Sequence, residues 1–220
     1  MTRRVQDAEA GRRAAIDALR AGGIVALPTD TVYGIAVALS TPGGIERLFA
    51  AKDRPPDKAI SVLIDGLDQL DGLALIPRAA GVLSRVGWPG ALTLVLPLRP
   101  AVAGALLPAS LTAGTATLGV RVPAHPCPRA LARALGPLPT TSANRSGEPD
   151  ALDAAAVEAS LGEAIDLIVD GGRTRGSVAS TVVDCASADG LPRVLRVGAL
   201  APSVLAAALD RAGLAHAIDG

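Results

Sequence analysis

The sequence predicts an α/β fold in which the strands of a mixed β-sheet alternate with helices. Half of the 220 residues are apolar and 19% are charged, so the chain can bury a sizeable core. Short apolar runs alternate with segments that carry helix start and stop signals, as expected for an α/β protein. The runs are irregularly spaced, which favours a mixed sheet over a purely parallel one.

The first elements show this alternation clearly. Residues 7–21 are predicted to form a helix, which Gly22 and Gly23 end. Residues 24–27 then form a short apolar run typical of a buried strand, and a second apolar run spans residues 35–39. A polar turn separates the two runs.

The next helix is expected to begin at Thr41 and Pro42, with Thr41 as its N-cap and Pro42 in its first turn, and to run to about Lys52. Further strands are predicted at residues 60–64, 92–96, 118–122, 167–169, 181–185 and 194–197. Further helices are predicted at residues 78–86, 128–135, 152–161 and 202–212.

We expect residues 1–220 to form one domain. Residues 97–108 are rich in Pro and Ala, but this stretch is too short to separate two domains. The segments that carry chemistry lie between about residues 12 and 200. Residues 201–220 are expected to form a closing helix and a tail.

Charge and cysteine content narrow the class of protein. Basic and acidic residues balance at 21 each, which argues against a protein that coats nucleic acid through bulk electrostatics. Cys127 and Cys185 share no metal-ligand spacing, so two reduced thiols are expected. The charged N-terminus lacks the apolar run of a signal peptide, and the apolar stretches are too short to span a bilayer. A cytoplasmic protein without a membrane partner is therefore expected.

The segment P-T-D-T-V-Y-G at residues 28–34 follows a predicted strand. Loops at strand ends gather functional groups on a rigid sheet, and its two threonines can offer hydroxyls to a polar ligand. The alternative is a turn in which Asp30 and Thr31 bond their own backbone.

A cluster of cations ends the helix that precedes residue 53. Lys52, Arg54 and Lys58 lie within seven residues of one another. Cations are favoured in the last turn of a helix by its dipole, so a solvated helix end is one interpretation. The other is a triphosphate site, for which Lys supplies a point charge and Arg a bidentate fork. Pro55 and Pro56 stop the helix and stiffen the loop that orients these cations.

Three later segments are also rich in polar groups. Arg121 interrupts an apolar strand pattern, so it needs an anionic partner, which is either an internal carboxylate or a ligand. Residues 139–147 are expected to form a loop whose small side chains hold phosphate or ribose oxygens, or form an ordinary turn. Arg196 adds a cation close to the glycine at position 198.

Several familiar devices are missing from the sequence. It contains no G-x-x-x-x-G-K-[ST] loop, no G-x-G-x-x-G fingerprint and no H-E-x-x-H motif. His125 and His216 are the only histidines, which excludes a site built on several histidines. A serine hydrolase that uses Ser142 and His125 stays open, but no nucleophile-elbow motif supports it.

Taken together, the order and spacing of these segments carry a family resemblance. From about residue 23 to residue 198 the chain resembles the YrdC-like family of threonylcarbamoyl-AMP synthases. The motifs are P-T-D-T-V-Y-G at 28–34, K-D-R-P at 52–55, W-P-G-A-L-T at 88–93, G-V-R-V-P at 119–123, S-A-N-R-S-G at 142–147, S-T-V-V-D at 180–184 and L-R-V-G at 195–198.

The resemblance implies a twisted, open mixed sheet flanked by helices, with a concave ligand cleft. It also implies a nucleotidyltransferase that converts L-threonine, bicarbonate and ATP to threonylcarbamoyl-AMP and pyrophosphate, for the threonylcarbamoyladenosine modification of tRNA. Mg²⁺ is expected to accompany ATP, held by phosphates and water rather than by a protein cage. The product is expected to pass to a tRNA threonylcarbamoyl-transferase complex. The chain is similar to the short form of the family, which lacks an extra C-terminal domain.

The motifs also assign residues. The resemblance implies that the phosphates of ATP are surrounded by a catalytic group of four residues, Lys52, Arg54, Ser142 and Asn144. ATP binding is implied for these four and for Lys58, Thr117 and Arg196. Threonine binding is implied for Thr31, Arg121, Thr140 and Ser180, with Arg121 on the substrate carboxylate. Leu63 departs from the pattern, because many family members have a histidine there.

Two alternatives remain. One is a carbamoyltransferase that acts on carbamoyl phosphate through a carbamoyl-adenylate, although relatives of that kind usually carry this domain within much longer chains. The other is an RNA-binding module that binds tRNA directly. Zero net charge and the presence of only three aromatic residues argue against the RNA-binding module, because charge neutralisation and base stacking both lack residues.

Overall fold

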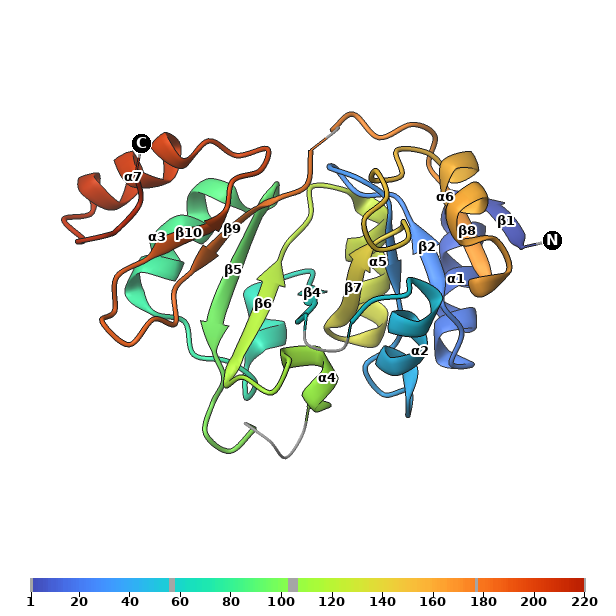
Figure 1. Cartoon of the computed structure of the whole chain (residues 1–220), viewed down its shortest axis with the longest axis horizontal. Helices are drawn as coiled ribbons and strands as arrows, with labels where there is room; N and C mark the ends of the chain where they lie inside the picture. Colours follow the sequence, from blue (N-terminus) through green and yellow to red (C-terminus); the bar gives the residue numbers. More distant parts are fainter. Residues whose placement is uncertain (1, 56–57, 103–106, 177, 220) are drawn as a thin grey trace.

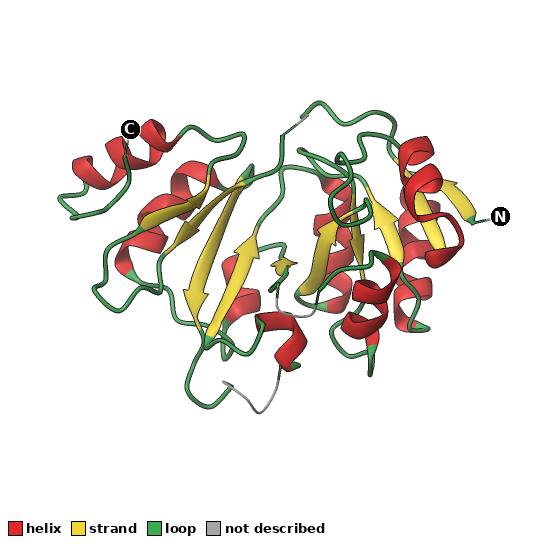
Figure 2. Ribbon diagram, viewed as in Figure 1, coloured by secondary structure: helices red, strands yellow, loops and turns green. Residues whose placement is uncertain are grey.

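The computed structural model describes residues 2–55, 58–102, 107–176 and 178–219. In these residues a ten-stranded mixed sheet runs through the molecule, with helices packed against it (Figure 1, Figure 2). The N-terminus lies beside β1 at one end of the molecule and helix α7 lies at the other end (Figure 1). Within the described ranges, no helix is long and apolar enough to cross a membrane.

The elements follow the alternation expected from the sequence. The strands are β1 (Arg3–Gln6), β2 (Val25–Leu27), β3 (Gly34–Ala36), β4 (Ser61–Leu63), β5 (Leu92–Pro97), β6 (Thr117–Arg121), β7 (Leu138–Ser142), β8 (Leu167–Asp170), β9 (Thr181–Asp184) and β10 (Arg193–Arg196). The α-helices are α1 (Glu9–Arg20), α2 (Gly44–Ala51), α3 (Arg78–Gly87), α4 (Ala109–Thr112), α5 (Pro126–Leu135), α6 (Ala154–Leu161) and α7 (Pro202–Arg211). Two 3₁₀ turns, η1 (Leu67–Leu70) and η2 (Gly162–Ala164), complete the set.

The strand order in the sheet is β1-β8-β2-β3-β7-β4-β6-β5-β9-β10. Strands β1/β8, β2/β8, β4/β6 and β5/β9 pair in parallel, and the other neighbours pair antiparallel. The predicted mixed sheet is therefore confirmed. The order brings segments from the whole chain together at its centre, where β7 and β4 lie beside β6 and β5.

The sheet separates two apolar cores. In β8, Leu167 and Val169 pack in a smaller core with α1 and α5, whereas Ile168 belongs to the larger core. Successive side chains of a strand point to opposite faces, so this alternation assigns the two cores to the two faces of the sheet. The larger core also receives the apolar residues of α2, α3, α6 and α7. Because three aromatic residues are available, it is built almost entirely from aliphatic side chains.

The predicted start of helix α2 is wrong. The helix begins at Gly44, and its N-cap is Gly43 in the left-handed conformation with φ of 65°, not Thr41. The Thr41 carbonyl accepts the Gly44 N–H instead, so residues 41–44 form a turn before the helix. A left-handed residue cannot continue a right-handed helix, and therefore Pro42 lies outside it. The predicted end is correct, because Lys52 is the C-cap.

Two strands were not predicted. Strand β1 has the sequence R-R-V-Q, without the apolar alternation of a half-buried strand, because it lies at the edge of the sheet. Strand β7 occupies the first half of the segment expected to be a loop, and residues 139–142 therefore pair with β3 and β4. Threonine favours strands, so the T-T pair at 140–141 is a signal that could have revealed β7.

Candidate active site

A cavity of about 370 Å³ lies over the central strands of the sheet. Its lining residues come from β3, β4, β5, β6, β7, β9 and β10, from the loops that follow α2, β2 and β7, and from the segment just before β9. It has the size of a small-molecule site.

Strand alternation explains why the cavity has a polar lining. In β6, Thr117, Gly119 and Arg121 line the cavity, whereas Leu118 and Val120 pack in the larger core. In β5, Thr93 and Val95 line the cavity, whereas the leucines between and beside them pack in the larger core. In β4, Ser61 and Leu63 line the cavity and Val62 packs in the larger core, although Leu63 also belongs to the smaller core. One face of these strands therefore stabilises the fold while the other presents small and polar side chains to a ligand.

Eight of the eleven site residues predicted from the sequence line this cavity, although they span 166 positions. They are Thr31, Arg54, Thr117, Arg121, Thr140, Ser142, Ser180 and Arg196. Lys52, Lys58 and Asn144 are not among the lining residues. Lys52 and Asn144 lie directly behind Ser142, as their hydrogen bonds show, and Lys58 is exposed.

Lys52 is a buried cation at the C-terminal end of α2, with 2% of its surface exposed. Its ammonium donates to the backbone carbonyls of Ser142 and Asn144, and at 3.3 Å to Asn144 Oδ1. Burial, reinforced by the nearby Arg54, lowers the pKa of Lys52 to about 8. The ammonium thus fixes the backbone that follows β7, and three of the four predicted catalytic residues are in contact.

The loop at residues 143–150 is held from several sides. Asn144 Nδ2 donates to the Glu148 carbonyl at 2.6 Å, and the Ser146 N–H donates to the Lys52 carbonyl at 2.9 Å. The Arg145 N–H donates to Ser160 Oγ on α6 at 3.0 Å. The loop is therefore ordered by bonds to both neighbouring helices.

Arg54 enters the cavity from the loop after α2. Its Nε donates to the Lys58 carbonyl at 3.2 Å and its Nη2 donates to the Ala59 carbonyl at 2.8 Å. The guanidinium also lies 5.7 Å from the centre of the Phe49 ring. The predicted contribution of Pro56 to the stiffness of this loop falls outside the described residues.

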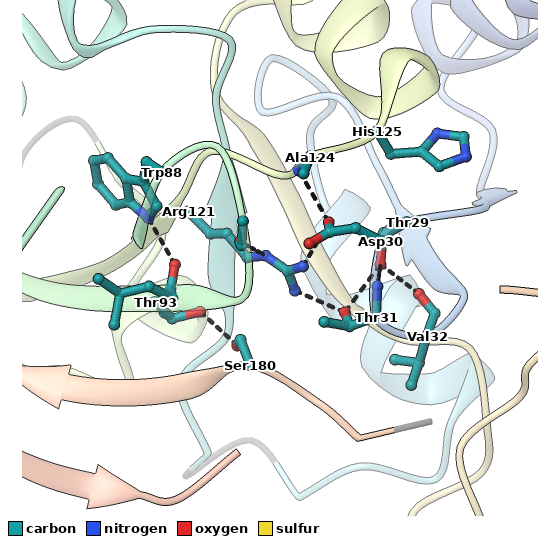
Figure 3. Close-up of polar contacts among 12 residues, drawn as sticks. Thr29, Asp30, Thr31, Val32, Trp88, Thr93, Arg121, Ala124, His125 and Ser180 are labelled. Atoms are coloured by element: carbon teal, nitrogen blue, oxygen red, sulfur yellow. Dashed lines mark hydrogen bonds and ion pairs between the residues drawn. The ribbon is translucent and has the colours of Figure 1, made fainter. Parts of the chain in front are cut away.

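Arg121 is a further cation among the lining residues, with 6% of its surface exposed, and its guanidinium points toward Asp30 and Thr31 (Figure 3). Its Nη2 pairs with Asp30 Oδ1 at 2.7 Å, and its Nη1 donates to Thr31 Oγ1 at 2.9 Å. Its Nε donates to the Gly90 carbonyl at 2.9 Å. Of the two partners left open by the sequence, the internal carboxylate is present, and the guanidinium still lines the cavity.

The hydroxyl of Thr31 faces the cavity as a hydrogen-bond acceptor. A hydroxyl donates one hydrogen, and Thr29 gives its own to the Val32 carbonyl at 2.7 Å. In the Thr29–Thr31 pair, whose oxygens are 3.0 Å apart, Thr31 must therefore be the donor. Because Thr31 also accepts from Arg121, its remaining lone pair suits an N–H or O–H of the ligand.

The hydroxyl groups of Thr140 and Thr117 also donate their hydrogen atoms within the protein. Thr140 donates to the Leu138 carbonyl at 2.8 Å. Thr115 donates to the Thr112 carbonyl at 2.8 Å, so in the Thr115–Thr117 pair, at 2.8 Å, Thr117 is the donor. The hydroxyls of both residues are thus left as acceptors at the cavity surface, which suits amine and hydroxyl groups of a ligand.

Ser180 and Arg196 complete the wall of the cavity. Ser180 Oγ lies 2.8 Å from Thr93 Oγ1, and Arg196 Nη2 donates to the Ser180 carbonyl at 2.8 Å. A Cβ on Gly198 would clash with the carbonyl groups of Ala179 and Ser180, so the glycine of the L-R-V-G segment permits this close approach.

Several lining residues were not assigned a role from the sequence. Thr93 lies within the W-P-G-A-L-T segment, so its motif was a signal that could have identified it. Ser61 and Asp150 had no such signal. Leu63, which departs from the family pattern, lines the cavity and is the register partner of Arg121.

The hydrolase alternative gains no support from His125. Its Nδ1 accepts the Cys127 N–H at 3.2 Å and caps helix α5, and its side chain is not among the cavity-lining residues. In the described part of the chain, no three His, Cys, Asp or Glu side chains cluster to hold a metal.

Comparisons with known proteins show the family to which the chain belongs. Residues 17–198 match the Sua5_yciO_yrdC family model, described as telomere recombination. A Bacillus subtilis protein named threonylcarbamoyl-AMP synthase is 41% identical over 184 residues, which cover 83% of this chain and 51% of the relative. A Chromohalobacter salexigens protein of the same name is 37% identical over 188 residues, which cover 81% of this chain and 95% of the relative. The chain thus spans about half the length of one relative and nearly all of the other.

A solved structure supports the same conclusion. The crystal structure of Pyrococcus abyssi Sua5 complexed with L-threonine is 36% identical, with a TM-score of 0.85, and the match covers 95% of this chain and 60% of that one. The family model spans most of the chain, and both the fold and the sequence agree with it. The chain belongs to the Sua5/YciO/YrdC family.

Proposed function

We propose that this protein is an L-threonylcarbamoyladenylate synthase, which makes threonylcarbamoyl-AMP and pyrophosphate from L-threonine, bicarbonate and ATP. The observation that carries the proposal is the cavity itself, which gathers Arg54, Arg121 and Arg196 with a set of hydroxyl acceptors. The relatives described above support the choice of substrates, since they are named for this product and one was crystallised with L-threonine.

The reaction needs two events. The amine of L-threonine first forms a carbamate, either by adding to carbon dioxide with release of a proton or by condensing with bicarbonate with release of water. A carbamate oxygen then attacks the α-phosphate of ATP and pyrophosphate leaves, so the reaction conserves atoms and needs no redox partner. Such a step depends on positioning and on charge neutralisation more than on a protein nucleophile.

The two ends of the cavity suit the two substrates. At one end, Arg121 supplies N–H donors for the carboxylate of L-threonine, and Thr31 and Thr140 supply acceptors for its amine. At the other end, Arg54 and Ser142 face the phosphates of ATP. Arg196, a lining residue close to Arg121, is proposed as a further cation for the nucleotide. This division assigns charge neutralisation to one end and substrate recognition to the other.

Lys52 and Asn144 act from behind Ser142 in this proposal. Lys52 bonds the carbonyls that flank the loop, and Asn144 connects its ammonium to the Glu148 carbonyl. We infer that together they hold Ser142 at the phosphates and place a positive charge close to the developing pyrophosphate. Lys58 and Thr117 are proposed to contact the nucleotide at its outer edge.

Mg²⁺ is proposed to enter with ATP. Asp150 is a carboxylate among the lining residues and can contact water molecules of the hydrated ion. The described residues offer no three-ligand cluster, so phosphate oxygens and water are expected to hold the ion.

The product is a reactive mixed anhydride, so an acceptor must take up its threonylcarbamoyl group. We propose a tRNA threonylcarbamoyl-transferase complex as the partner, and a cytoplasmic location. Both free cysteines are buried, as expected for a protein in a reducing compartment.

The deciding experiment measures pyrophosphate release from ATP by the purified protein and identifies the nucleotide product by mass spectrometry. Release that depends on both L-threonine and bicarbonate, with threonylcarbamoyl-AMP as the product, is expected. Release that depends on carbamoyl phosphate instead would establish the carbamoyltransferase alternative. Tight, salt-sensitive tRNA binding without ATP turnover would establish the RNA-binding alternative.

A further inference from the structure

Asp30 is a carboxylate next to the cavity rather than in its lining. Its Oδ1 accepts from Arg121 Nη2 at 2.7 Å and from the Ala124 N–H at 3.0 Å (Figure 3). The first contact reaches the side chain that ends β6, and the second reaches the loop that leads to α5. Asp30 therefore connects the segment after β2 to β6 and to the chain that follows it.

The bonds of Arg121 leave a defined pair of donors. A guanidinium has five N–H groups, and Gly90, Thr31 and Asp30 accept from one each on Nε, Nη1 and Nη2. One N–H therefore remains on each of the two terminal nitrogens. Each of these remaining N–H groups can donate a charge-assisted hydrogen bond to a carboxylate oxygen. Their direction is set by the three bonds already made.

Asp30 is the charged member of the three acceptors. Burial lowers the pKa of Arg121, Asp30 acts in the opposite direction, and the neighbouring Arg196 lowers it further. The side chains of Arg121 and Asp30 are 8% and 16% exposed, so water screens this pair weakly. Without the carboxylate of Asp30, the buried guanidinium of Arg121 would lie near the positive charge of Arg196. Only neutral oxygen atoms would then accept its hydrogen bonds.

We propose that Asp30 is a positioning residue, which holds the Arg121 guanidinium with its two remaining N–H groups toward the carboxylate of the amino-acid substrate. The inference rests on the proposed function, in which Arg121 binds that carboxylate. It goes further because it assigns a part in the recognition of the L-threonine carboxylate to Asp30, which does not line the cavity. The acceptor on Thr31 and the donors on Arg121 are then set by one short segment, residues 29–31.

The test is the steady-state kinetics of three variants, with pyrophosphate release as the readout. Asp30→Asn keeps the shape and one acceptor oxygen but loses the charge. It is expected to raise the KM for L-threonine by about tenfold, while kcat and the KM for ATP change less than about threefold. Asp30→Glu keeps the charge on a longer stem and is expected to recover part of the lost affinity. If the role of Asp30 were its shape alone, Asp30→Asn would be the milder of the two.

Asp170 offers a matched control. Its carboxylate accepts from Arg4 Nη2 at 2.7 Å and from the Gly172 N–H at 2.9 Å, so its geometry resembles that of Asp30. Its side chain is 11% exposed, and neither Asp170 nor Arg4 lines the cavity. Asp170→Asn is expected to leave the KM for L-threonine unchanged. Thermal melting of all variants separates a loss of fold from a loss of recognition.

A double-mutant cycle with Arg121→Lys completes the test. If Asp30 acts through Arg121, Asp30→Asn has little further effect on the KM for L-threonine once Arg121 is replaced. An unchanged KM in folded Asp30→Asn, an equal rise in Asp170→Asn, or additive effects in the cycle would each overturn the inference while leaving the proposed function intact. A wild-type protein without threonine-dependent pyrophosphate release would instead overturn the proposed function, and the inference with it.

Discussion

Two buried cations lie at the site, Lys52 behind Ser142 and Arg121 in the lining of the cavity, and their hydrogen-bond acceptors differ. The Lys52 ammonium is bonded by neutral oxygens of Ser142 and Asn144, whereas the Arg121 guanidinium is paired with the carboxylate of Asp30. Both cations tie a functional segment to the sheet. The pKa of Lys52 falls to about 8, so its charge is lost as the pH rises through this value, whereas an arginine beside a carboxylate stays charged.

The difference suits two kinds of ligand. A triphosphate brings its own negative charge, and in the proposed function Lys52, whose hydrogen bonds go to neutral oxygens, supplies an opposite charge close to the phosphates. An amino-acid carboxylate carries a single charge and must be distinguished by direction, which a guanidinium held by three bonds provides. In the proposed function, Lys52 therefore serves mainly to attract the phosphates of ATP, and Arg121 serves mainly to orient the carboxylate of the amino acid.

Among the variants that test this comparison, Lys52→Met is expected to have the largest effect. It removes the ammonium and keeps most of the side-chain volume, and we expect turnover to fall on the order of a hundredfold. The Ser142 and Asn144 carbonyls lose their donor, so the free energy of unfolding should also fall by about 1–3 kcal/mol. Pyrophosphate release and denaturant unfolding measure the two effects.

Arg47→Met is the control for that variant. Arg47 is a cation on the same helix that also donates to a backbone carbonyl, that of Gly22, and it does not line the cavity. It should reduce turnover less than about twofold. Wild-type turnover in folded Lys52→Met would show that the charge of Lys52 is not used.

A pH series is expected to separate the two ends of the cavity. With a pKa of about 8, Lys52 is almost fully charged at pH 7 and about one tenth charged at pH 9, because raising the pH removes its proton. The affinity for ATP should therefore fall by up to about tenfold over this interval, and the fall should be absent in Lys52→Met. Equilibrium binding of ATP avoids titration of the threonine amine. An equal fall in Lys52→Met would assign the pH dependence to another group.

Gly119→Ala is expected to have the smallest effect. A Cβ at this position would meet Ser61 Cβ at 3.5 Å and Thr93 Cγ2 at 3.7 Å, which are ordinary contacts, so the fold should accept it. The methyl group would occupy cavity space between the two ends and should raise KM values by about threefold with an unchanged melting temperature. Measuring the KM for ATP and the KM for L-threonine in turn would show which substrate binds closer to Gly119. Unchanged KM values for both substrates would place this part of the cavity outside the site.

Local patterns predicted most of the fold. Eight of the ten strands in the described residues coincide with apolar runs, because each has at least one face in a core. The edge strand β1 was missed because its side chains are mostly exposed. Helix α2 starts two residues later than the Thr41–Pro42 signal indicates, because Gly43 adopts a left-handed conformation that the sequence pattern does not specify.

The sequence by itself determined the chemical inventory of the site. Cations, hydroxyls and glycines in ordered motifs predicted the residues, and strand alternation explains why Thr117 and Arg121 of β6 share one face of the sheet. Only the tertiary structure decided their partners. Asp30 meets Arg121 across 91 positions and Lys52 meets Ser142 across 90, and such contacts follow from strand order, which local propensity does not encode. Charge and residue type are local properties of the sequence, whereas which cation is neutralised depends on the long-range packing of the sheet.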